Sequence, residues 1–230
     1  LLELGGSDPS IILPDADFKK ACQTIARSRL QNAGQVCISA KRAFVPRVQI
    51  EQTIELFKSA FTGIIDAQPS LVGPLAETRF KTDYNNIVTE LKKHSQVVFE
   101  KDMNALNINE NQAFVNPCIL VFDHHHEILN KTEVFGPCLI LIPYDTVDEA
   151  IQMANSTVFG LGASVYGTDE KLAQNVAHQI LAGQVSINDY VKSDIALPFG
   201  GFKMSGMGRE SGHQGFFEFT QTRVISLRKK

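Results

Sequence analysis

Two side chains in this sequence have the chemistry of a covalent catalyst. Cys37 lies in the segment NAGQVC, just after a glycine expected to end a helix, and its small neighbours leave room for a substrate to reach the sulfur. A thiolate is a strong nucleophile, but it needs a lowered pKa or a nearby base to be available. Glu3 lies in the segment ELGG, where the flanking glycines let a carboxylate move toward or away from a cleft. Either segment alone is weak support for catalysis, so the elements around them must be considered.

The second half of the chain alternates strand and helix patterns. Apolar runs at 138–144, 161–167 and 183–188 read as strands, and amphipathic stretches at 147–156 and 169–180 read as helices. Strands that alternate with helices at this spacing favour a parallel arrangement. The sequence therefore predicts an α/β fold with a mostly parallel sheet flanked by helices, in one domain that spans residues 1–230.

The first half supplies further elements of both kinds. A helix is expected after Asp15 or Asp17, either of which could cap it, and it should stop at Gly34. The remaining predictions are a strand at 42–46, helices at 48–64 and 79–94, and a short strand at 95–100. Cys37 would then lie between the first helix and a strand.

Composition excludes several classes of function. The net charge of −3 gives no basic field for nucleic acid or an anionic membrane, and 43% hydrophobic with 20% charged residues is typical of a globular protein. None of the four cysteines has CxxC spacing, so we expect reduced thiols in a cytoplasmic protein. The sequence contains neither GxGxxG nor GxxxxGK[ST]. The three histidines of DHHHEIL point in different directions in any regular element, so no metal site is predicted.

Several further segments occur in a fixed order with ELGG and NAGQVC. They are PDADF, GPL at 73–75, EVFGP at 133–137, NSTVFGLGASVY at 155–166, GQVSIN at 183–188 and PFGGFKMSGMGRE at 198–210. In this order they resemble the aldehyde dehydrogenase superfamily over essentially the whole chain.

The resemblance implies an activity and a role for each matching residue. Cys37 matches the nucleophile that attacks an aldehyde and becomes a thioester, and Glu3 matches the general base that activates the hydrolytic water. The presence of Glu3 argues against the branch that passes the acyl group to coenzyme A. The implied coenzyme is NAD or NADP.

The same resemblance implies four residues that contact the coenzyme. Glu133 and Phe135 match the pair that holds the nicotinamide ribose and ring, and Leu4 and Gly5 match backbone that approaches the nicotinamide. Outside the resemblance, Glu133 reads as a solvated charge and Phe135 as a core aromatic.

The resemblance also covers only part of the family's length. It implies that residues 1–230 are a catalytic domain, that the segment from about 212 to 230 packs at a subunit interface, and that the N-terminal coenzyme-binding domain is absent. The coenzyme phosphate turn and the asparagine that stabilises the oxyanion would lie in that missing part. The implied partners are a small aldehyde and, at full length, further copies of the same chain.

The substrate is indicated by a finer match. ELGGSDP and QNAGQVC look most like the bacterial succinate-semialdehyde dehydrogenase branch. Gln31 stands where some of those enzymes carry an arginine, and Ser193, beside Lys192, matches a serine that contacts the substrate carboxylate in some relatives. An ordinary surface loop is the alternative for Ser193 and Lys192. Two other functions stay open, a coenzyme-independent thiol esterase and an inactive remnant that acts as an assembly partner.

Overall fold

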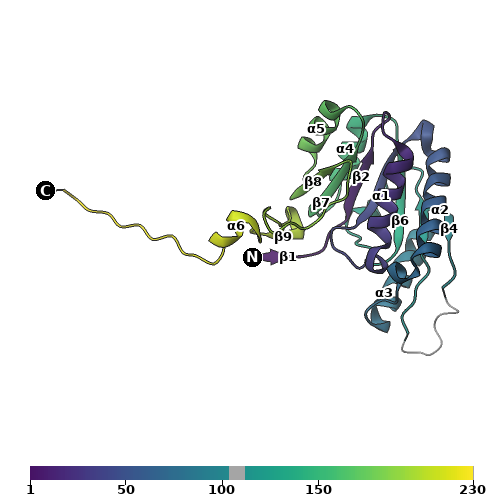
Figure 1. Ribbon diagram of the computed structural model, residues 1–230, viewed down its shortest axis with the longest axis horizontal. Coiled ribbons are helices and arrows are strands. Elements are labelled where there is room, and N and C mark those ends of the chain that lie inside the picture. The colour runs from purple at the N-terminus through teal and green to yellow at the C-terminus, as the bar shows by residue number, and fades with distance from the viewer. Residues whose placement is uncertain (104–111, 230) are drawn as a thin grey trace.

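The computed structural model describes residues 1–103 and 112–229, and its main feature is a seven-stranded sheet (Figure 1). The strands lie in the order β4-β5-β6-β3-β2-β7-β8. Every neighbouring pair is parallel except β4 and β5, which are antiparallel. The strands are β2 (Asp8–Ile12), β3 (Ala40–Pro46), β4 (Gln96–Glu100), β5 (Cys118–Val121), β6 (Cys138–Tyr144), β7 (Gly162–Tyr166) and β8 (Gln184–Ile187). The predicted mostly parallel α/β fold is confirmed.

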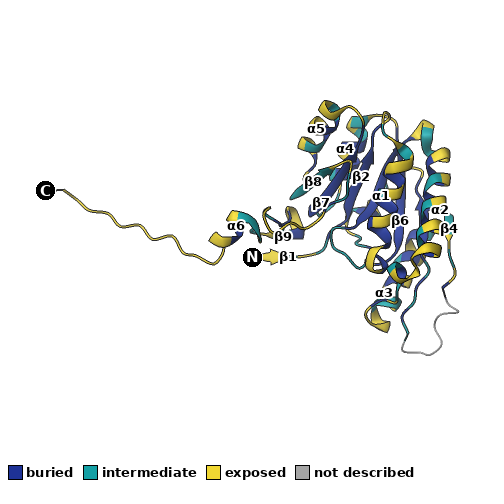
Figure 2. Ribbon diagram, viewed as in Figure 1, coloured by how far each residue is buried: buried dark blue, intermediate teal, exposed yellow. Residues whose placement is uncertain are grey.

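Helices cover both faces of the sheet because alternate strand residues point to opposite sides. In β3, Ala43 and Val45 pack with helices α1 and α2, whereas Phe44 belongs to the core on the side of α3, α4 and α5. The five inner strands of the sheet are buried between these two layers, whereas the edge strands β4 and β8 are partly exposed (Figure 2). The helices are α1 (Phe18–Leu30), α2 (Ile50–Ala67), α3 (Thr78–Lys92), α4 (Val147–Asn155) and α5 (Glu170–Gln179).

Helix α1 shows how local sequence sets an element's ends. Asp17 is the N-cap, and its carboxylate accepts a hydrogen bond of 3.0 Å from the Lys20 N–H. Asp15, the other candidate cap, instead binds the Thr168 and Asp169 N–H groups ahead of α5. The α-helix ends at Leu30, earlier than predicted, and a 3₁₀ turn over Gln31–Gly34 follows it.

Two of the sheet strands were not among the predicted elements. Strand β2 is fully buried and central, yet its sequence DPSII contains aspartate and proline and has no alternating pattern. Strand β5, CILV, is a four-residue buried run of the kind that periodicity cannot assign. Burial on both faces removes the alternation that reveals a half-exposed strand.

A smaller assembly joins the two ends of the sequence. Strand β1 (Leu2–Glu3) pairs antiparallel with β9 (Gly206–Met207), and helix α6 (Gly212–Phe217) follows. The chain after α6 runs away from the body and is exposed (Figures 1 and 2). Within the described residues, no helix combines the length and apolar character needed to cross a membrane.

Candidate active site

Cys37 lies in a turn between the first helix and β3, which we call the nucleophile turn (Val36–Ser39). The chain reverses just before this turn because Asn32, Ala33 and Gly34 all adopt positive φ values. A Cβ atom on Gly34 would lie 2.4 Å from the carbonyl of Gly136, so only glycine fits this approach. The Val36 carbonyl accepts hydrogen bonds from both the N–H and the hydroxyl of Ser39, which closes the turn.

The Cys37 thiol is half-buried, whereas Cys22, Cys118 and Cys138 are buried. Burial is the main influence on its pKa and raises it, and the nearby Lys41 is the largest opposing influence. The N–H groups of Cys37 and Ile38 also favour the thiolate. The lowered pKa that a nucleophile needs is therefore not reached within this chain, which leaves Cys37 dependent on cations and N–H donors to ionise.

Glu3 sits where the β1–β9 pair places it, opposite Gly206. One of its carboxylate oxygens, Oε1, is buried and has no hydrogen-bond donor among the described residues. Burial raises the pKa of Glu3, the neighbouring Glu210 raises it further, and Arg209 opposes both. An unpartnered carboxylate with a raised pKa has the properties of a general base that accepts a proton from water.

The Glu133 side chain contacts the glycine turn that follows Glu3. Its Oε1 accepts a 3.0 Å hydrogen bond from the Gly6 N–H, and a Cβ atom on Gly5 would lie 1.9 Å from its Oε2. A Cβ atom on Gly6 would lie 2.9 Å from the Cys37 carbonyl oxygen. The structure thus brings together the ELGG, NAGQVC and EVFGP segments, with the two glycines packed between Glu133 and the backbone of Cys37.

The sequence analysis missed a buried lysine at the centre of this group. Lys41 is in β3, its side chain is 1% exposed, and its Nζ donates to the Cys37 carbonyl at 2.7 Å. The same Nζ lies 3.6 Å from Glu133 Oε1. The available signal was a lysine within a run of buried strand residues, a position that requires a charged or carbonyl partner.

A pocket of about 260 Å³ opens beside the nucleophile turn and contains both predicted substrate residues. Gln31 lies on one wall, and Ser193 is on another with Lys192. The Lys192 ammonium pairs with Asp189 at 2.5 Å. The lining residues are Ser28, Gln31, Val36, Ile38, Ser39 and Tyr190–Ser193. The lining therefore combines apolar surface, such as that of Val36 and Ile38, with the polar groups of Gln31 and Ser193.

The sequence of this chain matches a known protein family. The sequence profile described as "Aldehyde dehydrogenase family" matches residues 1–225. The chain belongs to the aldehyde dehydrogenase family. It spans about half the length of the curated relatives it matches.

Named relatives agree with this membership. A probable succinate-semialdehyde dehydrogenase [NADP(+)] of a Synechocystis strain is 35% identical over 98% of this chain and 50% of its own. The structure of aldehyde dehydrogenase C of Pseudomonas syringae, a mutant with NAD+ and octanal, has a TM-score of 0.87 at 34% identity, covering 97% of this chain and 47% of that one. The succinic semialdehyde dehydrogenase of Streptococcus pyogenes with NADP+ also has a TM-score of 0.87, at 31% identity, over 99% of this chain and 50% of that one.

The residues near Gly5 fit the nicotinamide end of such a coenzyme. The Glu133 carboxylate, a group that can accept from ribose hydroxyls, occupies the space that a side chain at Gly5 would fill. The Phe135 ring is 41% exposed and Leu4 is 50% exposed, so both are free to contact a flat ring. Phe135 is therefore not the core aromatic that its type alone suggests. The Leu4 N–H donates to the Ser205 carbonyl at 2.9 Å, which fixes the backbone of this segment.

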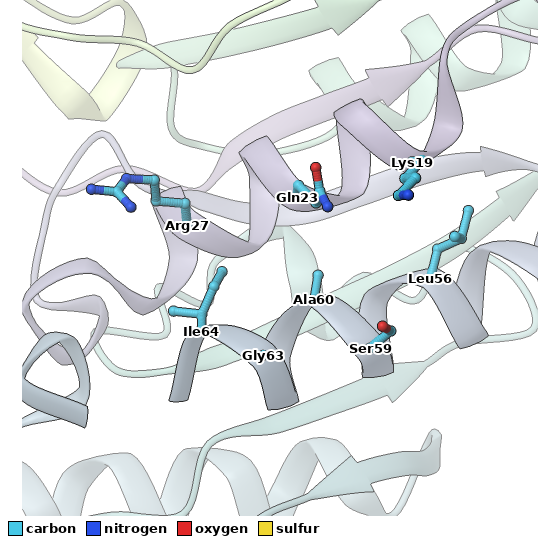
Figure 3. Close-up of a pocket in the computed structure, with 8 residues that line it drawn as sticks. All are labelled: Lys19, Gln23, Arg27, Leu56, Ser59, Ala60, Gly63 and Ile64. Carbon is cyan, nitrogen blue, oxygen red and sulfur yellow. The ribbon is translucent and has the colours of Figure 1, made fainter. Parts of the chain in front are cut away.

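Two other features of this aldehyde dehydrogenase chain do not join the site. A groove of about 450 Å³ between α1 and α2 is lined by Lys19, Gln23 and Arg27 on one side and by Leu56, Ser59, Ala60, Gly63 and Ile64 on the other (Figure 3). None of the predicted site residues lines it.

Within residues 1–103 and 112–229, no group of His, Cys, Asp or Glu side chains is arranged to hold a metal ion. His125 contacts Asn130, and His126 accepts from the Ile128 N–H.

Proposed function

We propose that this chain is the catalytic portion of an NAD(P)-dependent aldehyde dehydrogenase that converts succinate semialdehyde to the dicarboxylic acid. The observation that carries the proposal is the position of Cys37. Its turn lies between the Glu133–Gly6 contact, which fits a nicotinamide coenzyme, and the pocket lined by Gln31 and Ser193.

Each residue has a defined role in the proposed reaction. The Cys37 thiolate adds to the aldehyde carbon, and the substrate stays attached to Cys37 until water releases the acid. A bound oxidised nicotinamide coenzyme would supply the hydride acceptor, with Glu133 and Phe135 holding its ribose and ring. Glu3 takes a proton from the water that attacks the acyl group on Cys37, and its raised pKa suits this task.

The pocket chemistry supports a substrate with a polar far end. The Gln31 amide and the Ser193 hydroxyl are donors that a second carboxylate could accept from, whereas the Lys192 ammonium already pairs with Asp189. Octanal, which the Pseudomonas relative binds, has a purely apolar chain. A short semialdehyde would use these donors, whereas an alkyl chain would leave them unpaired.

The test measures reduced-coenzyme formation by the 230-residue chain with succinate semialdehyde and octanal, each with NAD+ and NADP+. We expect no turnover from this chain alone, because we assign the phosphate-binding turn and the oxyanion donor to a preceding domain. Loss of one oxyanion donor typically costs about 10²–10³ in rate. Turnover that disappears in Cys37→Ala would show that such a domain is dispensable.

A substrate-protection experiment tests the pocket without a coenzyme. Succinate semialdehyde should slow iodoacetamide alkylation of Cys37 more than octanal does, and Ser193→Ala should reduce the difference. Equal protection by both aldehydes would contradict the proposed substrate. Ester hydrolysis that needs Cys37 but no coenzyme would favour the thiol esterase instead, and a folded chain with an unreactive Cys37 would favour the assembly partner.

We also infer oligomerisation at full length and a cytoplasmic location. The exposed chain after α6, which carries Val224, Ile225 and Leu227, supports packing against another copy. Four unpaired cysteines support a reducing compartment.

A further inference from the structure

The Lys41 ammonium is surrounded by backbone carbonyls of the nucleophile turn. Its Nζ donates to the Cys37 carbonyl at 2.7 Å and to the Val36 carbonyl at 3.2 Å. A carbonyl accepts but cannot neutralise a cation, and the side chain is only 1% exposed. The turn therefore holds this ammonium, and the ammonium holds two successive residues of the turn in place.

The same ammonium connects the turn to the proposed coenzyme residue. Glu133 Oε1 lies 3.6 Å from Lys41 Nζ and also accepts the Gly6 N–H at 3.0 Å. Three segments far apart in the sequence thus converge on Lys41 and one carboxylate. A shift of the ammonium would move the nucleophile turn relative to Glu133.

Charged groups face Lys41 from each neighbouring element. They are Asp8 from β2, Glu133 from the loop before β6, Arg29 from α1, and the Cys37 thiol. Asp8 also faces Cys37 and disfavours its thiolate, whereas Lys41 favours it. Arg29 donates to the Gly34 carbonyl.

From these contacts we propose that Lys41 is a positioning residue, which fixes the nucleophile turn against Glu133 and places beside Cys37 a cation that favours its thiolate. The inference rests on the proposed role of Cys37 as the nucleophile. Lysine suits the position because its compact ammonium has three donors, whereas the planar guanidinium of arginine presents its donors in a fork.

The pH dependence has a defined sign. Burial and then the nearby Arg29 lower the pKa of Lys41 to about 8. Below that pH the ammonium is charged, holds the turn and favours the thiolate. Above it, the cation is lost, so the increase in Cys37 reactivity with pH should be shallower than for an isolated thiol.

The test compares Lys41→Met and Lys41→Arg with the wild type and with Lys171→Met, an exposed control on α5. Alkylation of Cys37 by iodoacetamide is followed as a function of pH by mass spectrometry of the peptide, with Cys37→Ala as the blank. In Lys41→Met, the rate near about pH 7.5 should fall about threefold to tenfold, and the midpoint should move to higher pH, because thiolate is lost but each remaining thiolate is more nucleophilic. Lys41→Arg should recover part of the rate.

A folded Lys41→Met variant with the wild-type profile would overturn the proposal. Circular dichroism and thermal unfolding establish whether that variant folds. A second measurement avoids the variant altogether: carbon NMR of labelled lysine follows the titration of Lys41 in the wild type. An enclosed ammonium should titrate with a pKa of about 8, and the ordinary pKa of an exposed lysine would show that the turn does not hold it and would also overturn the proposal.

These readouts separate the inference from the function on which it builds. Thiol alkylation needs neither aldehyde nor coenzyme. A shifted profile in a chain that never protects Cys37 with a semialdehyde would reject the proposed substrate and support the role of Lys41. Protection of Cys37 by the semialdehyde, together with an unshifted pH profile in Lys41→Met, would support the proposed substrate and reject the role of Lys41.

Discussion

Charged side chains are buried around the β2–β3 pair, and each has a specific partner. The Arg42 guanidinium donates to the Ser7 carbonyl and to the Met153 and Ala154 carbonyls at the end of α4. The Met153 carbonyl also accepts the Ser156 N–H, and the Arg42 guanidinium adds donors at this helix end and ties α4 to the sheet. Asp8 is 3% exposed and accepts the Gly162 N–H at 3.2 Å, while its Oδ2 has no donor among the described residues.

Asp8 should make stability fall as the pH rises. Burial raises its pKa to about 6, although Lys41 and Arg42 oppose this. Between the unfolded pKa near about 4 and the folded value, only the folded state keeps the proton, so the unfolding free energy falls with pH in that window. The unfolding free energy of Asp8→Asn, measured relative to that of the wild type, should therefore rise by about 2–3 kcal/mol from about pH 4 to about pH 7. Urea unfolding at both pH values measures this, and a constant difference would contradict it.

Glu3 should control release of the acyl group from Cys37. An activated ester can acylate Cys37 without coenzyme, and hydrolysis of that acyl group then needs a base. We expect Glu3→Gln to slow deacylation about 10²-fold without a comparable effect on acylation. In the wild type, deacylation should accelerate as the pH rises through a pKa above that of an ordinary glutamate, because burial and Glu210 raise it. Stopped-flow acylation and mass spectrometry of the intermediate separate the two steps, and equal deacylation rates would remove Glu3 from the mechanism.

At the level of elements, glycines permit the close packing that brings the site segments together. Gly136, in EVFGP, packs against the ring of Tyr84 from α3, and a Cβ atom there would lie 2.2 Å from the ring. The Tyr84 hydroxyl donates to the Asn116 carbonyl at 2.8 Å, so the ring cannot move aside freely. Gly34 approaches the carbonyl of Gly136 from the other side. The position of Glu133 and Phe135 thus depends on a contact that no side chain at Gly136 would allow.

Gly136→Ala should lower the unfolding free energy by about 1–3 kcal/mol, the usual cost of overpacking a rigid contact. Gly63→Ala is the matched control, because a Cβ atom on Gly63 meets nothing within 4 Å on the surface of α2. That control should raise the unfolding free energy by about 1 kcal/mol through better helix propensity. Denaturant unfolding of both variants tests the pair, and a neutral Gly136→Ala would show that the Tyr84 contact relaxes.

At the level of the whole molecule, the body, meaning the sheet with its helices, encloses the hydrophobic core, whereas the C-terminal segment after α6 is exposed. The sheet and its two helical layers bury two hydrophobic clusters. Within residues 1–103 and 112–229, the last hydrogen bond along the C-terminal segment runs from the Thr220 hydroxyl to the Phe217 carbonyl, and Val224, Ile225 and Leu227 are each more than four-fifths exposed. Stability should therefore come from the body alone.

Truncation after Thr220 should leave the unfolding free energy within about 0.5 kcal/mol of wild type. If the segment packs between copies, as the family resemblance implies, truncation should instead lower the molar mass of any oligomer the chain forms. Light scattering after size-exclusion chromatography measures that mass. A large loss of stability in a monomeric chain would show that the segment folds back onto its own body.

Much of the fold was predictable because local chemistry specifies it. Glu133 is a candidate only through the resemblance to the aldehyde dehydrogenase superfamily. Locally, Asp17 caps α1, apolar runs mark β6 to β8, amphipathic stretches mark α4 and α5, and ELGG and NAGQVC present Glu3 and Cys37. Each of these local signals depends on neighbours within a few residues. Such signals survive in a linear reading because turns, caps and one-sided burial act over short distances.

Long-range packing determined the remaining features. The central place of β2, the ammonium of Lys41 between Cys37 and Glu133, and the shared pocket of Gln31 and Ser193 all join segments that are distant in the sequence. A buried parallel strand has no alternation to reveal it, and a lysine does not show in its sequence which carbonyls will receive its protons. The carbonyl partners of Lys41 prove to lie in the adjacent nucleophile turn, but Glu133 reaches the ammonium only once β3 and β6 lie side by side, which is why the local pattern named the nucleophile but not the cation beside it.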